Sequence, residues 1–330
     1  MRTPITMSDL ARRLGVSVAT VSNALSGKGR VSPELAETIR RTAERAGYVP
    51  SHAGRALRTG KTGTIGLIVP DLSNPLFPTF AQAIERAAKR RGYAVLLADS
   101  LDDAAQQAKE ISTLLARGAD ALIIIPRRGT QIDHIPVPLA LLDSLATAGN
   151  TVASDHRGGG LLIGRHLREL GHRDVLILAG TESSTVAKER MAGMREGLGQ
   201  DAKVTLVSSP ASLQAGLEQG RAFVPGSATA IACAYDTLAL GVLSALAQRG
   251  IRVPEDVSVT GFDDLIWSEI SHPPLTTVRQ NFGEIAEIAI GFVTGEIDRG
   301  QLVPVEMVTR ASTAAPVKKA ASTSHLQGAV

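Results

Sequence analysis

The segment that most constrains this chain is residues 6–27, TMSDLARRLGVSVATVSNALSG, which predicts two short helices joined by a tight glycine turn. Thr6 is placed to cap the first helix, and Gly15 supplies the left-handed residue that ends it. Ser17 then caps a second helix, predicted over 18–25. This construction is typical of a helix-turn-helix, whose second helix enters the major groove of DNA by its N-terminal end. The sequence therefore predicts an all-α DNA-binding head.

The second helix of this head leaves one face for DNA, because Val21 and Ala24 are expected to point inward. The side chains expected to face DNA are Thr6, Ser17, Val18, Ala19, Thr20, Ser22 and Asn23. Asn23 carries the amide that pairs with adenine through two hydrogen bonds. The hydroxyls of Thr20 and Ser22 suit phosphate oxygens, which position a protein on DNA without reading its sequence.

Charge is distributed unevenly along the chain. Residues 1–61 contain 11 Lys and Arg against 4 Asp and Glu, a net charge of +7, whereas the remainder contains 24 against 28, a net charge of −4. Basic side chains on the head would neutralise phosphates and release counterions, so its affinity for DNA should fall steeply with salt. An ordinary basic surface is the alternative explanation, and the coincident motif favours DNA binding.

Beyond residue 62, short apolar runs alternate with helical patterns. A first series contains strands predicted at TIGLIVP, YAVLLAD and ADALIIIP, and a second contains DVLILAG, KVTLVSS, TAIACAY and DVSVTGF. The second series begins with a helix predicted after the glycines at 158–160, and another helix is predicted to open at Arg190. Two βαβ series imply an α/β core of two lobes, each with a doubly wound parallel sheet.

Ligands bind folds of this kind in the crevice at the carboxyl ends of the strands. The side chains predicted there offer carboxylates, amides, one guanidinium and aromatic faces, which suit a polyhydroxylated small molecule such as a sugar. They are Asp71, Asn74, Phe77, Arg190, Tyr235, Asp263 and Gln280. Several carboxylates precede helices, so helix capping is the alternative role for each of them.

Other classes of function find little support in the sequence. The single cysteine, Cys233, and seven scattered histidines predict neither a disulfide framework nor a metal site. The chain has no nucleophile elbow and no phosphate-binding glycine loop, so we expect no catalytic residues and no cofactor. It shows no signal peptide and no apolar run long enough to span a bilayer, which predicts a cytoplasmic, nucleoid-associated protein without a membrane partner.

Motifs along the whole chain resemble one family. The run DLARRLGVSVATVSNALSG, then VSPE and AGYVPS, is similar to the head of the lactose/galactose repressor family of bacterial transcription regulators, the LacI/GalR family. The match continues through NPLF at 74–77, ELGHR at 169–173, RMAG at 190–193 and VPEDVSVTGFDD at 253–264. The motifs arrive in the family's order, and the resemblance covers residues 5 to about 313.

The resemblance implies a domain organisation. A helix-turn-helix head is expected at 1–49, a hinge at 50–61, a periplasmic-binding-protein-like core at 62–313 and a disordered tail at 314–330. Within the core, the first lobe is expected at about 62–155 and 280–303, and the second at about 156–279 and 304–313. The chain crosses back near Gln280, so that a helix over 282–299 returns to the first lobe.

The hinge of such a family becomes a helix on DNA and inserts a leucine into the minor groove. By position that leucine is Leu57, with Arg55 near phosphates. Packing of Leu57 on the core is the alternative. Gly54 stands where the family usually has alanine and should weaken the hinge helix by ~1 kcal/mol.

The family further implies a regulator of transcription, expected to be a repressor, which binds a near-palindromic operator as a homodimer. A small-molecule effector, expected to be a sugar or related metabolite, switches it from between the two lobes. By family position Arg190 and Asp263 are ligand contacts and Asp236 is structural, while the role of Asp264 stays open. Dimer contacts are expected from first-lobe helices, including 80–91.

Two departures from the family are expected to change the shape of the effector pocket. The segment 127–138 is too short for the helix that relatives have there, and Leu76 and Tyr235 replace residue types that would shape the pocket differently. A sugar-binding module or a sugar-processing enzyme with the same core is the alternative function. The basic head and the missing export signal argue against an exported sugar-binding module.

Overall fold

The computed structural model describes residues 5–27, 29–48, 60–126, 132, 135–142, 149, 151–181 and 184–317. The chain divides into two compact units, Met1–Gly63 and Thr64–Val330. Arg55, Leu57, Gly54 and most of the segment 127–138 lie outside the described residues, so what the sequence predicts for them stays a prediction.

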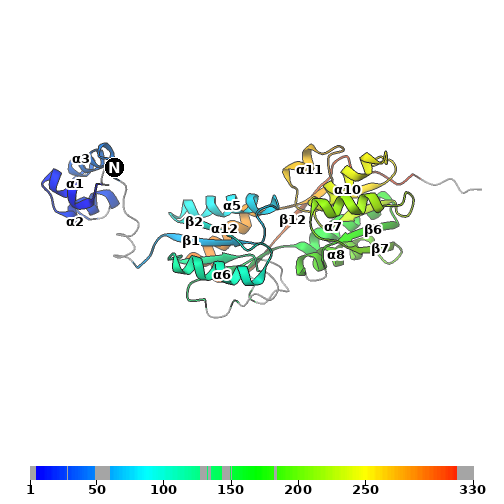
Figure 1. Ribbon diagram of the computed structural model, residues 1–330, viewed down its shortest axis with the longest axis horizontal. Helices are drawn as coiled ribbons and strands as arrows, with labels where there is room; N and C mark the ends of the chain where they lie inside the picture. The colour runs from blue at the N-terminus through cyan, green and yellow to red at the C-terminus, as the bar shows by residue number, and fades with distance from the viewer. Residues whose placement is uncertain are drawn as a thin grey trace, which may run out of the picture. The chain divides into compact units, whose positions relative to one another are not determined.

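The described residues of the first unit form a head of three helices (Figure 1). Its helices are α1 (Met7–Leu14), α2 (Val18–Ser26) and α3 (Pro33–Arg45). Gly15 ends α1 in the left-handed conformation, and Ser17 caps α2, as the sequence predicts. Leu10, Val21 and Ile39 meet in the fully buried centre of the head, one from each helix. The predicted helix-turn-helix head is confirmed.

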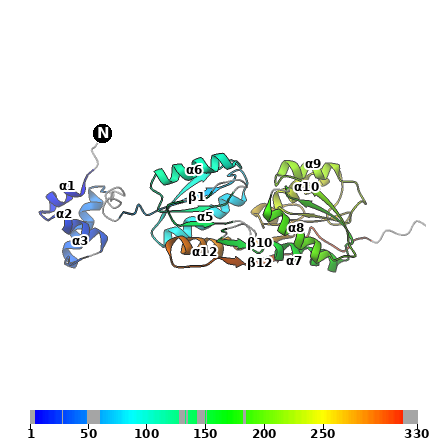
Figure 2. The same ribbon diagram turned by 90° about the horizontal axis from the view of Figure 1, so that it is seen from below.

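The first lobe of the second unit is built on a parallel sheet with the order β2-β1-β3-β4. Its strands are β1 (Thr64–Val69), β2 (Ala94–Asp99), β3 (Ala121–Ile124) and β4 (Leu139–Leu141). Its helices are α5 (Leu76–Arg90), α6 (Ala104–Ala116) and α12 (Phe282–Thr294). α5 and α12 lie side by side on one face of the sheet, and α6 covers the other (Figure 2).

The second lobe repeats this architecture with the sheet order β7-β6-β8-β9. Its strands are β6 (Asp174–Ala179), β7 (Lys203–Ser208), β8 (Ala230–Cys233) and β9 (Ser258–Thr260). Its helices are α7 (His156–Leu170), α8 (Thr185–Leu198), α9 (Leu213–Ala222), α10 (Asp236–Gln248) and α11 (Ile266–Ile270). α7 and α8 cover one face of the sheet, and α9 and α10 cover the other (Figure 2). The predicted pair of doubly wound lobes is confirmed.

Three passages of the chain connect the lobes. β5 (Val152–Ser154) leads into α7, β10 (Thr277–Gln280) leads back into α12, and β12 (Val305–Val308) returns to the second lobe. β10 and β12 pair antiparallel, and β5 pairs in parallel with β11 (Gln301–Val303). Since all three passages run close together, residues near their ends from both lobes are brought to one place.

Two predicted helix starts are wrong, and the reason is tertiary packing. The glycines at 158–160 lie inside α7 rather than before it, and α8 begins at Thr185, five residues before Arg190. A Cβ on Gly160 would overlap the backbone carbonyl of Arg190, and one on Gly193 would overlap that of Arg157. The glycines therefore let α7 and α8 touch backbone to backbone, despite their low helix propensity.

The end of α12 also differs from the one predicted. α12 ends at Thr294 rather than 299, where Gly295 adopts a left-handed φ of 81°. A glycine in this conformation is the usual stop of a helix.

Candidate DNA-reading helix and effector pocket

The N-terminal end of α2 presents short side chains to solvent. Val18 is 45% exposed, and Ala19 beside it is also exposed. The Ser17 hydroxyl accepts a hydrogen bond from the Thr20 backbone N–H at 3.0 Å, and the two hydroxyls are 2.9 Å apart. Ser17 and Thr20 therefore stiffen the first turn of α2, and a helix end of this kind attracts anionic groups such as phosphates.

Two more of the predicted DNA-facing residues are tied to local structure. Thr6 and Asp9 form a capping box at the start of α1, which lowers the pKa of the Asp9 carboxyl. Asn23 is exposed on α2 and packs against the next turn: a Cβ on Gly29 would lie 2.8 Å from its Nδ2 atom. Gly29 has a φ of +85°, a left-handed conformation that favours glycine. The turn therefore depends on this residue, which was not among those predicted to be important. Ser22 is half-buried on α2.

A cavity of about 170 Å³ lies where the two lobes meet. From the first lobe it is lined by Pro70, Leu76, Phe77, Phe80, Ile125, Pro126, Leu142, Val152, Ala153, Ser154, Phe282 and Ile285. From the second lobe and the end of β10 it is lined by His156, Ser184, Val186, Arg190, Tyr235 and Gln280. The cavity sits at the carboxyl ends of the strands, where the fold predicts a ligand.

Four of the seven predicted effector residues line this cavity: Phe77, Arg190, Tyr235 and Gln280. The other three do not line it. Asp71 accepts a hydrogen bond from the Ser73 backbone at 2.8 Å, and Asn74 accepts one from the Leu76 backbone at 3.1 Å, so both shape the loop before α5. Asp263 lies behind the cavity, 5% exposed.

Arg190 is the centre of the polar part of the site and is only 1% exposed. Its guanidinium forms an ion pair with Asp263 at 2.9 Å and donates to the Ala234 carbonyl at 2.7 Å. It also lies over the rings of Phe262, at 3.8 Å, and Tyr235, at 4.9 Å. Because α8 places Arg190 in this enclosure, its charge is fixed in position and already compensated.

Asp263 connects Arg190 to the passages between the lobes. Its carboxylate accepts a hydrogen bond from the Gln280 amide at 2.7 Å, and Gln280 accepts one from the Ser154 hydroxyl at 2.6 Å. Burial raises the pKa of Asp263 to about 7, although Arg190 and Gln280 favour its charged form. The chain Ser154–Gln280–Asp263–Arg190 therefore links both lobes through buried hydrogen bonds.

The neighbouring acidic residues have structural partners. Asp236 is fully buried and accepts hydrogen bonds from the Ser268 and Thr277 hydroxyls, each at 2.6 Å, and from the Leu265 backbone at 2.9 Å. Burial raises its pKa. Asp264 pairs with Arg279 at 2.6 Å and with Arg310 at 2.7 Å. Each arginine lies close to one of the passages between the lobes.

Several residues that line the cavity are not predicted from the sequence, for two reasons. Ser154 and His156 flank the passage from β5 to α7, and no strand-end motif marks them. The apolar lining residues, such as Phe80 and Ile285, occupy positions that the helix pattern predicts as ordinary core. Only the topology shows that these core positions also face a cavity.

Within the described residues, no group of three or more His, Cys, Asp and Glu side chains has the arrangement of a metal site. None of the described helices combines the length and apolar character needed to cross a membrane. Cys233 is buried in β8, and burial raises the pKa of its thiol.

Comparisons with known proteins agree with this architecture. The model for bacterial regulatory proteins of the lacI family matches residues 6–51, and the model for a periplasmic binding protein-like domain matches residues 165–313. The ribose operon repressor of Haemophilus influenzae is 31% identical over 298 residues, which cover 86% of this chain and 90% of that repressor.

Two solved structures extend the agreement to three dimensions. The lac repressor dimer bound to operator and the anti-inducer ONPF superposes with a TM-score of 0.84 at 28% identity, covering 95% of this chain and 100% of the other. A LacI family transcriptional regulator from Enterococcus faecium with bound ribose superposes with a TM-score of 0.67 at 27% identity, covering 76% of this chain and 99% of the other.

A helix-turn-helix head followed by a two-lobed, ligand-binding core defines an effector-regulated transcription factor. The chain belongs to the LacI family of bacterial regulatory proteins. It is a DNA-binding transcriptional repressor under effector control, and its relatives are repressors rather than enzymes. The predicted family, function and absence of enzymatic activity are therefore confirmed.

Proposed function

We propose that this chain represses transcription as a homodimer on a near-palindromic operator, and that a sugar or related metabolite in the cavity between the lobes switches it. The observation that carries the proposal is the chain of hydrogen bonds Ser154–Gln280–Asp263–Arg190, which joins cavity-lining residues of both lobes. A molecule that alters these hydrogen bonds changes how the two lobes are held relative to each other. The resulting change in the free energy of operator binding is set by the difference between the molecule's affinity for the operator-binding state of the protein and its affinity for the other state.

The homodimer is supported by apolar side chains on the first lobe. Leu72, Leu97 and Leu101 are 36%, 45% and 69% exposed, and Leu97 lies on β2, the edge strand of its sheet. The Asp99 carboxylate accepts hydrogen bonds from the backbones of Leu72, at 3.0 Å, and Leu101, at 2.8 Å, which holds the two leucines near β2. An exposed edge strand with apolar neighbours is a favourable surface for a second copy.

The helix expected to make dimer contacts, 80–91, has a different character. Its apolar residues Phe80, Ile84 and Ala87 are buried in the lobe, while its outer positions are polar and charged. We therefore place the centre of the dimer contact on β2 and its flanking leucines, with the outer face of α5 at the polar rim.

DNA recognition in this proposal follows the predicted division of the chain. The head over 1–49 reads the operator through the exposed start of α2, and the hinge over 50–61, with Arg55 and Leu57, contacts the centre of the operator. The core over 62–313 carries the effector. An operator lies in the chromosome, which places the protein in the cytoplasm. The ribose bound to the relative from Enterococcus faecium supports a sugar as the class of effector.

Selection of bound duplexes from a random library, with the full-length chain at near-physiological salt, tests this proposal. We expect a near-palindrome with a strongly preferred central step. Asn23→Ala should relax the preference at one symmetric pair of positions, worth ~1–3 kcal/mol, while Glu44→Ala on the exposed side of α3 should leave the selected sequence unchanged. Sequence-blind binding that depends only on salt would contradict the proposal.

A further inference from the structure

The strand β10 carries polar contacts on both of its faces where it passes between the lobes. Gln280 lines the cavity and donates its amide to Asp263 at 2.7 Å. Arg279, the residue before it, is exposed on the opposite face of the strand and donates to Asp264 at 2.6 Å. Two consecutive residues of β10 are therefore held by two consecutive residues of one turn, and only the inner contact belongs to the cavity.

The outer contact is part of a row of alternating charges that crosses the passages between the lobes. β10 and β12 run side by side there (Figure 2), with Glu306 directly opposite Arg279, and these two side chains pair at 3.6 Å. Arg310, which follows β12, lies 2.7 Å from the other oxygen of Asp264 and donates to the Leu275 carbonyl at 2.9 Å. We call the row Glu306–Arg279–Asp264–Arg310 the outer ladder. It ties β10 and the segment after β12 to the turn that follows β9.

The turn has a backbone conformation that needs support from its surroundings. Asp263 and Asp264 have φ angles of +122° and +51°, a region that residues other than glycine rarely adopt. Such a conformation persists only where the surrounding structure enforces it. The Asp263 backbone donates to the Val278 carbonyl at 2.8 Å, and the two carboxylates bind opposite faces of β10. The turn and the strand therefore hold each other in place.

Burial differs along the outer ladder. The side chains of Asp264 and Arg310 are largely buried, whereas those of Arg279 and Glu306 are at least half exposed. Loss of one partner from a buried pair is costly, and salt weakens an exposed pair. Among the described residues, the Asp264 Oδ1 atom has no aligned hydrogen-bond donor, although Arg310 is close to it. This contact therefore depends on the charges of the two groups more than on hydrogen-bond geometry.

From these observations we infer that Asp264 is a positioning residue and that the outer ladder is an ionic latch on the passages between the lobes. It holds β10 and the segment after β12 against the second lobe, so a rearrangement of the lobes has to open it. The consequence for DNA rests on the proposed function: the latch sets the operator affinity of the protein without effector. Asp264 does not line the cavity and acts from outside it, so its role is separate from that of Asp263.

Hydrogen–deuterium exchange of the full-length chain tests the latch without effector or operator. Asp264→Asn removes the charge and keeps a residue type that tolerates a positive φ. In this variant the backbone amides of β10 and β12 should exchange at least about tenfold faster, while the sheet β7-β6-β8-β9 keeps its rate of exchange. Arg157→Met is the matched control, since Arg157 pairs with Glu196 between α7 and α8 at 2.8 Å, away from the passages. It should leave the exchange of β10 and β12 unchanged.

The exposed end of the outer ladder provides a second test that does not depend on the folding of Asp264→Asn. Arg279→Met should speed the exchange of β10 and β12 roughly threefold, and Arg279→Lys, which keeps the charge, should restore most of the protection. Raising the salt concentration to ~1 M should speed this exchange in the unsubstituted chain and have little effect on it in Arg279→Met.

Operator affinity connects the latch to the switch. On a duplex obtained by the operator selection, at one fixed salt concentration, Asp264→Asn and Arg279→Met should shift the affinity in the same direction, by at least about threefold for Asp264→Asn. Arg157→Met should not shift it.

Three results would overturn the inference. Unchanged exchange of β10 and β12 in both Asp264→Asn and Arg279→Met would show that the outer ladder does not hold the passages. Faster exchange throughout the second lobe would show that Asp264 only supports the fold. Faster exchange confined to the passages, with unchanged operator affinity, would show that the latch has no part in the switch. The operator selection with the unsubstituted chain judges the proposed function separately from all three.

Discussion

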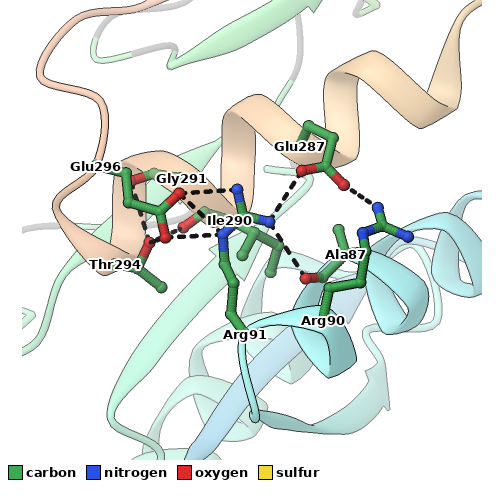
Figure 3. Close-up of polar contacts among 8 residues, drawn as sticks. All are labelled: Ala87, Arg90, Arg91, Glu287, Ile290, Gly291, Thr294 and Glu296. Carbon is green, nitrogen blue, oxygen red and sulfur yellow. Dashed lines mark hydrogen bonds and ion pairs between the residues drawn. The ribbon is translucent and has the colours of Figure 1, made fainter.

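The two lobes share one architecture and hold their helix pairs together in different ways. In the second lobe α7 and α8 approach backbone to backbone, because Gly160, Gly164, Gly193 and Gly197 leave no space for a Cβ at the contact. In the first lobe α5 and α12 are joined by side chains. Phe80 and Phe282 meet at the cavity end, and Arg91 binds Glu287 and Glu296 at the other end (Figure 3).

The difference matches what each lobe contributes to the cavity. α8 carries Arg190, whose backbone carbonyl is itself in the glycine contact with α7, so the polar wall belongs to a frame with little freedom to adjust. α5 and α12 carry the phenylalanines, and their contacts can rearrange by rotation of side chains. The polar wall of the cavity is therefore held by contacts between backbones, and the apolar wall by contacts between side chains.

The largest effect should come from Asp263→Ala, which leaves Arg190 as a buried charge without its partner. Loss of one member of a buried ion pair costs about 3–5 kcal/mol. The free energy of unfolding of the core, measured in urea, should be lower by this amount. The variant should no longer respond to the effector, while its head should still bind DNA. Asp263→Asn, which keeps an acceptor for Gln280, is the control and should lose less. An intact effector response in Asp263→Ala would contradict a role of the buried pair in the switch.

Gly160→Ala tests the rigid contact of the second lobe. The added methyl group would overlap the Arg190 carbonyl, so α7 and α8 would have to separate. Overpacking of this kind, here against backbone rather than a flexible side chain, should cost about 3 kcal/mol in urea unfolding. Gly283→Ala in α12 is the matched control, since its nearest neighbour would be the Asn281 side chain at 3.5 Å, and it should be neutral or slightly stabilising. Equal effects of the two substitutions would remove the distinction between the lobes.

Much of the fold could be predicted from the sequence, because the local signals agree with the tertiary structure. Ser17 and Gly15 mark the turn of the head by their caps, and the apolar runs mark the buried strands. The glycines of α7 could not be interpreted in this way. Locally they disfavour a helix, and only the close approach of α8, a contact between residues far apart in sequence, explains them.

The candidate site was only partly predictable for a related reason. The end of a parallel strand identifies Tyr235, which follows β8, whereas Arg190 is expected by family position and Gln280 by the crossover between the lobes. The same rule selects Asp71 and Asn74, whose side chains instead bind the backbone of their own loop. Whether a polar group at a strand end serves the ligand or its loop depends on the direction of its side chain, which the sequence does not encode locally.

The stability of the second lobe should fall as the pH rises toward 7. Burial raises the pKa of Asp263 to about 7 from its ordinary value near 3.9, so the folded chain keeps a proton there that the unfolded chain has lost. The resulting stabilisation is complete below about pH 4 and is lost as the pH rises through about 7, a decline of about 3 kcal/mol between pH 5 and 8.

Asp263→Asn, which does not titrate, provides the control for this measurement. The pKa values of His166 and His172 are lowered by burial, which raises stability with pH over the same range and is common to both chains. The difference in free energy of unfolding between the unsubstituted chain and Asp263→Asn isolates the effect. A difference that does not change between pH 5 and 8 would show that Arg190 keeps Asp263 ionised throughout.

The smallest effect should come from the contact that joins α5 to α12. Arg91 donates to both oxygens of Glu296, at 2.8–2.9 Å, and to Glu287 at 2.9 Å, and Arg90 also pairs with Glu287 (Figure 3). These bonds raise the pKa of Arg91 and lower those of both glutamates. The glutamate side chains are 40% and 49% exposed, so solvent screens the contact. Arg91→Met should cost only ~0.5–1 kcal/mol in urea unfolding at low salt, and less at ~1 M salt.

A double-mutant cycle with Glu296→Gln isolates the Arg91–Glu296 pair from effects of each side chain alone. A coupling energy that shrinks with salt would support a first lobe held by adjustable surface contacts. A coupling energy above ~2 kcal/mol that salt does not change would instead show that α5 and α12 are locked as firmly as α7 and α8. The contrast between the lobes would then lie only in the chemistry of their cavity walls.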